Sequence, residues 1–331
     1  MDHGAAGFPQ MRLRRLRRTP ALRRAFAEVR LDPSALVAPL FVKDGIDTPV
    51  PIRSMPGVMQ HTRESVRAEA KRLHAAGVTS FLLFGIPATK DAAGTSGWDA
   101  DGPVPAGLRG IRDDLGDDAV LWADVCLCEY TDHGHCGPLR DGTVDNDAAV
   151  EGYARQALAF AAAGADLVAP SGMMDGQVAA IRAALDGDGH QDTAIVAYAS
   201  KFASAFYGPF REAAESTPAI GDRAAYQEMG SNRREARCEV AADVAEGADV
   251  IMVKPALPYL DVVADARAQH DLPIAAYHVS GEYAMLKAAA ERGWIDGDHA
   301  LRESITSIHR AGADLAVTYG AGELAELLRS E

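Results

Sequence analysis

Short apolar runs recur along the chain and alternate with segments of helical pattern. The runs do not alternate apolar with polar residues, which is typical of strands buried on both faces. After the first run, residues 43–61 are rich in Pro and Gly and predict a loop, and Thr62 can cap a helix that ends near Ala76. The eight runs are residues 36–42, 80–85, 119–127, 166–171, 195–201, 250–255, 274–280 and 315–320.

The junctions between helix and strand repeat almost letter for letter. Gly77, Gly164, Gly247 and Gly312 each follow Ala or Glu and stand just before an apolar run, three of them in the sequence Gly-Ala-Asp. A glycine there can end a helix and turn the chain into the next strand. Repeated units of this kind predict a parallel sheet with helices outside. Eight units favour a (β/α)8 TIM barrel over an open doubly wound sheet, and no Gly-rich nucleotide motif follows any run.

The length of 331 residues allows two domains, but no linker or low-complexity tract divides the chain. Barrels of the α/β class commonly reach this size as one domain. We therefore predict a single TIM-barrel catalytic domain over residues 35–331, preceded by an extended N-terminal arm over residues 1–34 that makes subunit contacts.

Charge is distributed unevenly along the chain. The net charge is −14, yet residues 11–24 contain seven arginines and no acid, so the remainder carries −21. This acidic remainder would repel nucleic acid and anionic membranes, and we expect neither as a partner. The arm could be a nucleic-acid-binding segment or a transit peptide. Docking on an acidic neighbouring subunit accounts better for the asymmetry. The arginines are Arg12, Arg14, Arg15, Arg17, Arg18, Arg23 and Arg24.

The cysteine pattern and the lack of long apolar runs bear on the compartment. No run approaches the roughly 20 residues of a membrane helix, and no secretory signal is present. Of the four cysteines, Cys126, Cys128 and Cys136 are crowded together, which indicates a metal or redox cluster rather than a disulfide framework. Cys238 lies in a helical stretch and is interpreted as a small buried hydrophobe. We expect a cytoplasmic protein.

Two apolar runs end in lysine, at Lys201 and Lys254. At the rim of an apolar core, desolvation lowers the pKa of a lysine from about 10.4 towards neutrality, and a neutral amine can attack a carbonyl. One such lysine could instead extend its ammonium group to water. Because the arrangement occurs twice, it suggests a site that holds two carbonyl compounds. The C-terminal strand ends, where barrels gather their chemistry, also carry Asp124, Ser171, Ser280 and Tyr319.

Three thiols and two imidazoles lie between Cys126 and Cys136. Cys126 and Cys128 project to the same side of an extended chain, and a Gly-containing loop can bring Cys136 back towards them. Three thiolates suit Zn²⁺ and leave a fourth position open, as a catalytic zinc needs. A closed structural site with His133 or His135 as the fourth ligand stays open as an alternative.

Two arginines follow the Lys201 run, Arg211 and Arg223. They could clamp a carboxylate from a loop beyond the strand end, or form ordinary surface ion pairs. Ser280 and Tyr319 could donate hydrogen bonds to a second carboxylate. Alternatively, their hydroxyl groups could bond within the protein and have only a structural role.

Several long segments, taken together and in this order, resemble the porphobilinogen synthase (5-aminolevulinate dehydratase) family from about residue 12 to 325. The resemblance implies the condensation of two 5-aminolevulinate molecules to porphobilinogen with loss of two waters, an early step of tetrapyrrole (haem) biosynthesis. The segments are Met55-Pro-Gly-Val58, Asp124 to Gly137, Ala169-Pro-Ser171 with Met174-Asp-Gly176, Lys201-Phe-Ala-Ser204 with Phe206-Tyr-Gly-Pro-Phe-Arg211, Asn232-Arg-Arg-Glu235, Met252-Val-Lys-Pro-Ala256 and Val279-Ser-Gly-Glu-Tyr283.

The resemblance also implies roles for the candidate residues. Lys254 would form the Schiff base with the first substrate, whose carboxylate would meet Ser280 and Tyr319. Lys201 would hold the second substrate, with its carboxylate on Arg211 and Arg223. Zinc would polarise that second substrate. The zinc ligands would be Cys126, Cys128 and Cys136, and residues in supporting roles would be Asp124, Ser171 and Tyr207.

Further features follow from the same resemblance. Glu239 matches a position that binds an allosteric Mg²⁺ in some relatives, and the family is typically octameric, with N-terminal arms that embrace neighbours. Gly172 and Gln60 depart from it, since many relatives have Asp and Arg there. Two other functions stay open: a Schiff-base class I aldolase on the same barrel, and a non-catalytic zinc-binding assembly protein.

Overall fold

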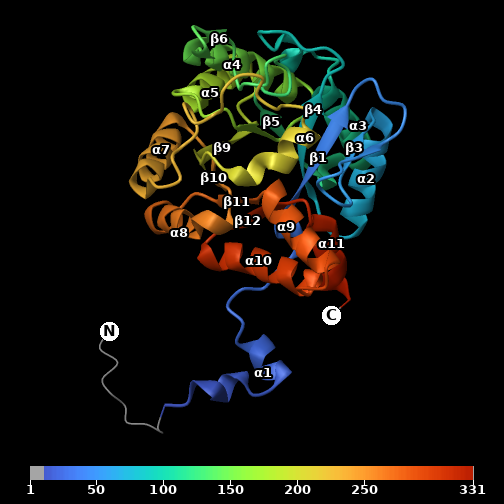
Figure 1. The fold of residues 1–331 in the computed structure, drawn as a ribbon, viewed down its shortest axis with the longest axis vertical. Coiled ribbons are helices and arrows are strands. Elements are labelled where there is room, and N and C mark those ends of the chain that lie inside the picture. Colours follow the sequence, from blue (N-terminus) through green and yellow to red (C-terminus); the bar gives the residue numbers. More distant parts are fainter. Residues whose placement is uncertain (1–10, 331) are drawn as a thin grey trace. The chain divides into compact units, whose positions relative to one another are not determined.

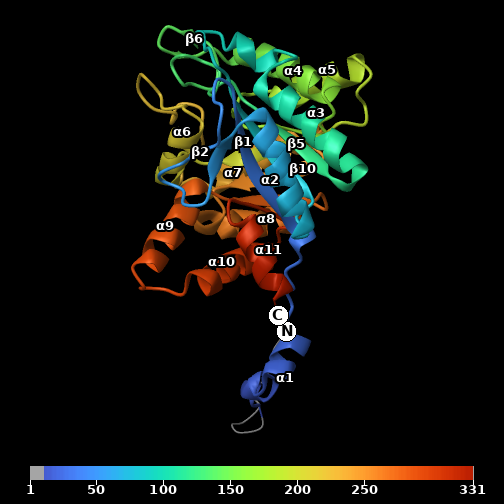
Figure 2. The ribbon, with the colours of Figure 1, turned by 90° about the vertical axis from the view of Figure 1, so that its right-hand side faces the viewer.

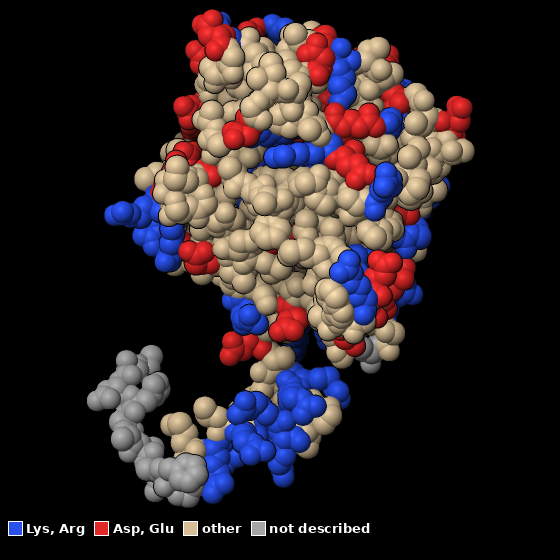
Figure 3. Space-filling view, in the orientation of Figure 1, with Lys and Arg blue, Asp and Glu red and all other residues tan. Residues whose placement is uncertain are grey.

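The computed structural model describes residues 11–330. Contacts within the chain separate residues 11–31 from a larger unit that begins at Asp32. The first unit holds the 3-10 helix η1 (Leu13–Arg17) and α1 (Pro20–Ala25), whose N-cap Thr19 accepts a 3.2 Å hydrogen bond from the backbone of Leu22. Arginine side chains crowd the surface of this unit (Figure 3). Residues 1–10 of the expected arm lie outside the described residues.

The larger unit is a closed barrel of eight parallel strands (Figure 1). The strands follow one another around the ring in chain order, and β1 pairs with β4 on one side and with β12 on the other. Each of the eight predicted apolar runs overlaps one of these strands to within a few residues, so the prediction of a TIM barrel is confirmed. The barrel strands are β1 (Leu36–Lys43), β4 (Ser80–Ile86), β5 (Val120–Val125), β8 (Leu167–Pro170), β9 (Ala194–Lys201), β10 (Val250–Lys254), β11 (Ile274–His278) and β12 (Leu315–Thr318).

Helices surround the strands on the outside (Figures 1 and 2). Thr62 caps α2 as predicted, because its side chain accepts the backbone N–H of Ser65 at 3.0 Å. The four junction glycines all have positive φ, between 94° and 122°, which explains why glycine recurs there. The helices are α2 (Arg63–Ala75), α3 (Pro103–Leu115), α4 (Asn146–Ala162), α5 (Gln177–Gly187), α6 (Gly208–Ala213), α7 (Arg233–Glu246), α8 (Leu260–Gln269), α9 (Ser280–Glu291), α10 (Gly297–Ala311) and α11 (Ala321–Arg329).

Two predictions of local structure were wrong. Residues 43–61 are not all loop, because β3 (Met59–His61) pairs with the end of β1, and β2 (Val50–Pro51) pairs with β3. Cys238 is exposed rather than buried. It lies two positions from Ala236 and from Val240, the buried residues of α7, so it points away from the barrel. A further small hairpin joins β6 (Leu139–Arg140) and β7 (Thr143–Val144).

The barrel interior is filled with large side chains, among them Trp122, Tyr198, Met252 and Tyr277. This packing supports the strand ends at which the candidate residues lie. Within residues 11–330, no helix is both long enough and apolar enough to span a bilayer.

Candidate active site

The two strand-end lysines lie side by side. Strands β9 and β10 are neighbours in the barrel, and Lys201 is directly opposite Lys254 in their register. Both side chains are buried, and their Nζ atoms lie 5.5 Å and 5.1 Å from the centroid of the same ring, that of Tyr198. The two amines therefore converge on one place.

Aromatic rings surround the amine of Lys254. Its Nζ lies 4.2 Å from the ring centroid of Tyr277, 5.1 Å from that of Phe210 and 5.5 Å from that of Tyr207. Burial, followed by the positive charge of Lys201, lowers the pKa of Lys254 to about 7. Much of this lysine is therefore a neutral amine near pH 7, the form that attacks a carbonyl.

A short polar chain connects Asp124 with Lys201. Asp124 is 6% exposed, and burial raises the pKa of its carboxyl group to about 6. Ser171 donates its hydroxyl to Asp124 Oδ2 at 3.1 Å, and the Nζ of Lys201 donates to the backbone oxygen of Ser171 at 2.5 Å. Oδ1 of Asp124 has no hydrogen-bond partner within the described part of the chain. This carboxyl group can take up or release a proton close to both lysines.

Three buried sulfur atoms form a compact cluster. The Sγ atoms of Cys126, Cys128 and Cys136 all lie within 4.8 Å of one another. Burial and the neighbouring sulfurs raise the pKa of Cys126, whereas hydrogen bonds from the other two thiols hold the pKa of Cys136 well below its usual value. Three sulfur donors at this spacing fit one soft cation such as Zn²⁺.

Neither histidine of the cysteine loop is free to complete a closed metal site. His133 donates from Nε2 to the backbone oxygen of Ala92 at 3.2 Å, and its Nδ1 accepts the backbone N–H of His135. His135 donates from Nε2 to Ile220 O at 2.7 Å and accepts from the Tyr226 hydroxyl at Nδ1. Both imidazoles are engaged in hydrogen bonds that hold loops together, so neither is free to act as a fourth ligand.

Lys201, Lys254, Cys128, Arg211 and Arg223 all line one narrow cavity. Phe210 and Tyr207 also line it, and its free volume of about 10 Å³ is too small for a substrate, so side chains of the lining must shift before one can bind. The sequence prediction of a cavity large enough for two keto acids is therefore not met by this conformation, although the predicted residues meet there.

The two arginines differ in their surroundings. Arg223 is 6% exposed, and its Nη2 donates to Gly134 O at 2.9 Å and to Ser216 O at 2.7 Å. It thus joins the cysteine loop to the segment after α6. Arg211 is partly exposed and lines the cavity. Both arginines line the same cavity, which brings together the two residue types that an anion clamp would need.

The remaining candidate residues lie beyond Lys254, away from the sulfurs. Ser280 accepts the backbone N–H of Phe210 at 3.0 Å and donates to Phe206 O. The hydroxyl of Tyr319 lies 3.1 Å from that of Tyr277. Neither lines the cavity of the lysines in this conformation. Tyr207 donates to the backbone oxygen of Lys254 at 3.3 Å, which suits a supporting role.

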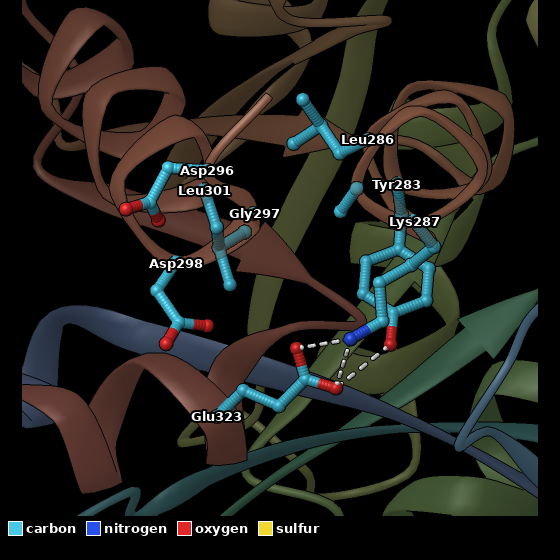
Figure 4. Close-up of a pocket in the computed structure, with 9 residues that line it drawn as sticks. Tyr283, Leu286, Lys287, Asp296, Gly297, Asp298, Leu301 and Glu323 are labelled. Atoms are coloured by element: carbon cyan, nitrogen blue, oxygen red, sulfur yellow. Dashed lines mark hydrogen bonds and ion pairs between the residues drawn. The ribbon is translucent and has the colours of Figure 1, made fainter. Parts of the chain in front are cut away.

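Glu239 lies outside this group. It is half-buried on α7 and lines a separate cavity of about 390 Å³. Another hollow, between α9, α10 and α11, contains none of the predicted residues (Figure 4). There Lys287 forms an ion pair with Glu323 at 2.7 Å, and the carboxylates of Asp296 and Asp298 lie across from it.

Sequence reasoning missed several residues of the site. The apolar wall around Lys254 is built by Tyr198, Tyr277 and Phe210. The sequence does not reveal this, because a tyrosine within a predicted strand could contact many different side chains. Glu129 is 2% exposed and lines the lysine cavity. Its position next to Cys128 was a usable signal, because an acid inside an otherwise buried segment is rarely there without a partner.

Comparisons with known proteins agree on one family. The family model described as delta-aminolevulinic acid dehydratase matches residues 10–327. The delta-aminolevulinic acid dehydratase of Streptomyces coelicolor is 54% identical over 325 residues, which cover 97% of this chain and 98% of that protein. The protein of the same name from Mycobacterium tuberculosis is 55% identical over 323 residues, 97% of this chain and 98% of its own.

A solved structure is similar over almost the whole chain. It is the delta-aminolevulinic acid dehydratase (porphobilinogen synthase) of Toxoplasma gondii in complex with the reaction product porphobilinogen. The TM-score is 0.93 at 45% identity, and the match covers 96% of this chain and 91% of the other.

Proposed function

The chain belongs to the delta-aminolevulinic acid dehydratase family, and we propose that Lys201 and Lys254 are the two residues through which it catalyses the family's reaction. The protein is a lyase that forms porphobilinogen from two molecules of 5-aminolevulinate, with loss of two waters, in tetrapyrrole biosynthesis. The convergence of two buried amines on the ring of Tyr198 is the observation that supports this assignment.

Lys254 is a competent nucleophile at neutral pH, because burial lowers its pKa to about 7. Its neutral amine attacks the ketone carbon of the first substrate, and loss of water leaves a Schiff base. Lys201 binds the second ketone in the same way. Each lysine must leave again as the ring forms, one displaced by a substrate amine and the other as the ring becomes aromatic, so that two waters are lost overall. An imine makes its own carbon electrophilic and the adjacent C–H acidic, so two imines held side by side can supply an electrophile and, after loss of a proton, a nucleophile within reach of each other.

Asp124 and Ser171 are suited to proton transfer beside these imines. Carbon–carbon bond formation needs the removal of a proton from one substrate, and Oδ1 of Asp124 is a buried acceptor without a partner in the described structure. Because the pKa of this carboxyl group is about 6, it is mostly ionised at neutral pH and can accept a proton. Ser171 orients the carboxylate through its hydroxyl.

The substrate carboxylates need separate partners. Arg211 and Arg223 line the lysine cavity and would supply guanidinium groups for the second substrate. Ser280 and Tyr319 are neutral donors on the side of Lys254, where the first substrate would lie. The Ser280 hydroxyl is engaged with the Phe206–Phe210 backbone. To donate to a substrate carboxylate it would have to give up its hydrogen bond to Phe206 O.

We assign Zn²⁺ to the sulfur cluster and Mg²⁺ to the cavity of Glu239. Cys126, Cys128 and Cys136 would hold the zinc, and the engaged imidazoles of His133 and His135 support an open site over a closed one. A thiolate-bound zinc supplies a Lewis acid that can polarise a substrate oxygen or orient an amine. Glu239 lies among other carboxylates, as a Mg²⁺ ligand would.

The assembly and location complete the proposal. We propose a homo-octamer in which the basic arm docks on an acidic surface of a neighbouring subunit, supported by the seven arginines of residues 11–24 against a remainder of charge −21. We place the enzyme in the cytoplasm, since its four cysteines are unpaired. Neither nucleic acid nor a membrane is expected as a partner.

Incubation of the full-length protein with 5-aminolevulinate, zinc and a reductant tests the function, with porphobilinogen as the readout. Borohydride trapping followed by peptide mapping tests the lysines. Lys201→Ala should still trap one substrate at Lys254, and a matched surface variant, Lys71→Ala, should behave as the wild type. A class I aldolase uses one lysine, so trapping confined to a single position in the wild type would favour that alternative and reject ours.

A further inference from the structure

An acidic cavity lies beside the strand that ends at Lys201. Its volume is about 390 Å³, and its lining includes side chains of α7 and of the β7 hairpin. Four of the residues that line it are acidic. Among the described residues, no Lys or Arg belongs to the lining. Burial and the neighbouring carboxylates, Asp175 first, raise the pKa of Glu239. Carboxylates crowded in this way attract a cation. The acids are Asp175, Glu228, Glu235 and Glu239.

Glu228 belongs both to this cavity and to the strand end of the active site. Its Oε1 accepts the backbone N–H of Lys201 at 3.0 Å, and its own backbone N–H donates to the backbone oxygen of Lys201 at 3.0 Å. The neighbouring Phe202 pairs with Glu228 in an isolated β-bridge. One residue therefore holds both main-chain polar groups of a lysine that we assign to catalysis.

The other carboxylate oxygen of Glu228, Oε2, is buried in the described structure without a hydrogen bond that meets normal geometry. The residue is 4% exposed, and the donor that acts on its carboxyl group is the Ser200 hydroxyl, which lowers its pKa against the effect of burial. Burial raises the pKa of this carboxyl group to about 7, so its charge is easily changed by its surroundings. A divalent cation in the cavity would give Oε2 a partner and would favour the ionised form. An ionised carboxylate accepts the N–H of Lys201 more strongly than a neutral one.

We propose that Glu228 is a positioning residue, which transmits the binding of a divalent cation in this cavity to the main chain of Lys201. The inference rests on the proposed function and on Mg²⁺ at Glu239, and it adds the route by which that cation acts. With the strand end held in place, Nζ of Lys201 stays directed at Ser171 O and at the ring of Tyr198.

Amide hydrogen exchange on the full-length protein, with and without Mg²⁺, measures this link directly. In the wild type, saturating Mg²⁺ should slow the exchange of the peptide that contains Lys201 by about fivefold, the factor expected when a neutral hydrogen bond becomes charge-assisted. Glu228→Gln should abolish the slowing. Glu228→Met, which places an apolar side chain of similar length there, should abolish the slowing as well. Agreement between two chemically different replacements would show that the effect does not come from misfolding of one variant.

Glu235→Gln is the matched control. It removes the same charge from the same cavity, but Glu235 bonds to Asn232 rather than to Lys201. Calorimetry should show weaker Mg²⁺ binding in this variant, with the slowing of exchange restored at saturation. The inference is overturned if Mg²⁺ does not slow amide exchange in the wild type, or if it slows exchange in Glu228→Gln as much as in the wild type. It is also overturned if exchange in Glu235→Gln is not slowed once calorimetry shows that its Mg²⁺ site is saturated. Porphobilinogen formation, assayed on the same samples, reports separately on the proposed function.

Discussion

Replacing Gly172 with alanine should destabilise the protein by clashing with one tyrosine. A Cβ at this position would lie 1.8 Å from the hydroxyl oxygen of Tyr153 and 2.4 Å and 2.6 Å from two of its ring carbons. Tyr153 is fully buried, and its hydroxyl donates to the backbone oxygen of Cys136 at 2.5 Å. The ring cannot withdraw from the new methyl group without giving up this hydrogen bond.

The cost follows from these two effects. Overpacking a well-filled core costs about 1–3 kcal/mol, and the loss of one hydrogen bond adds about 1 kcal/mol. The free energy of unfolding should therefore fall by about 2–4 kcal/mol in Gly172→Ala. Because Tyr153 supports the main chain at Cys136, the variant should also bind zinc more weakly, which titration with Co²⁺ and its thiolate absorption band would measure.

Denaturant unfolding of a double-mutant cycle identifies the tyrosine as the cause. In a Tyr153→Phe background the ring remains, and Gly172→Ala should still be costly. In a Tyr153→Ala background the ring is gone, and the same substitution should cost below about 1 kcal/mol. Gly187→Ala on α5, where a Cβ meets nothing within 4 Å, is the control and should be neutral or stabilising. An equal cost of Gly172→Ala in the Tyr153→Ala background would refute the reasoning.

Three further outcomes are expected. Since the pKa of Lys254 is lowered to about 7, the fraction of neutral amine grows as the pH rises through 7. The rate of borohydride-trapped adduct formation at this residue should therefore increase between about pH 6 and 8 and then level off; a rate that falls over this range would contradict the assignment. Removal of zinc by a chelator should abolish turnover while the circular dichroism spectrum is kept, whereas unfolding on chelation would indicate a structural metal. Arg223→Lys loses the group that bridges Gly134 O and Ser216 O, so KM should rise, with about 1–3 kcal/mol lost in unfolding free energy; unchanged values of both would exclude this bridging role.

The barrel could be predicted because its signals are local. A glycine with positive φ ends a helix within a few residues of the next buried strand, so each junction shows itself in a short window of sequence. Strand β3 gave no such signal. Met59–His61 becomes a strand because β1 continues beyond its pairing with β12, which involves only Leu36 and Val37, and leaves an edge at Phe41 and Val42 for it to pair with. This depends on contacts that are distant in sequence.

The site could be predicted only as far as the barrel fixes it. Parallel strands bring their C-terminal ends to one rim, so Lys201, Lys254 and the cysteines could be expected together. The lowered pKa of Lys254, however, depends on burial and on which rings face its amine. Those rings come from separate elements, Tyr277 from β11 and Phe210 from α6. Their meeting is a consequence of tertiary packing, which hydrophobic patterns do not encode.

The two departures from the family pattern acquire physical reasons in the structure. Gly172 provides the space that the ring of Tyr153 occupies. Gln60 is 5% exposed, and its Nε2 donates to Ala213 O at 2.8 Å, beside the ion pair of Lys43 with Glu215. This contact ties the end of the segment that carries Phe210 and Arg211 to the rim of the barrel. A shorter side chain at position 60 would lose this hydrogen bond, so it should weaken the attachment of that segment to the barrel rim.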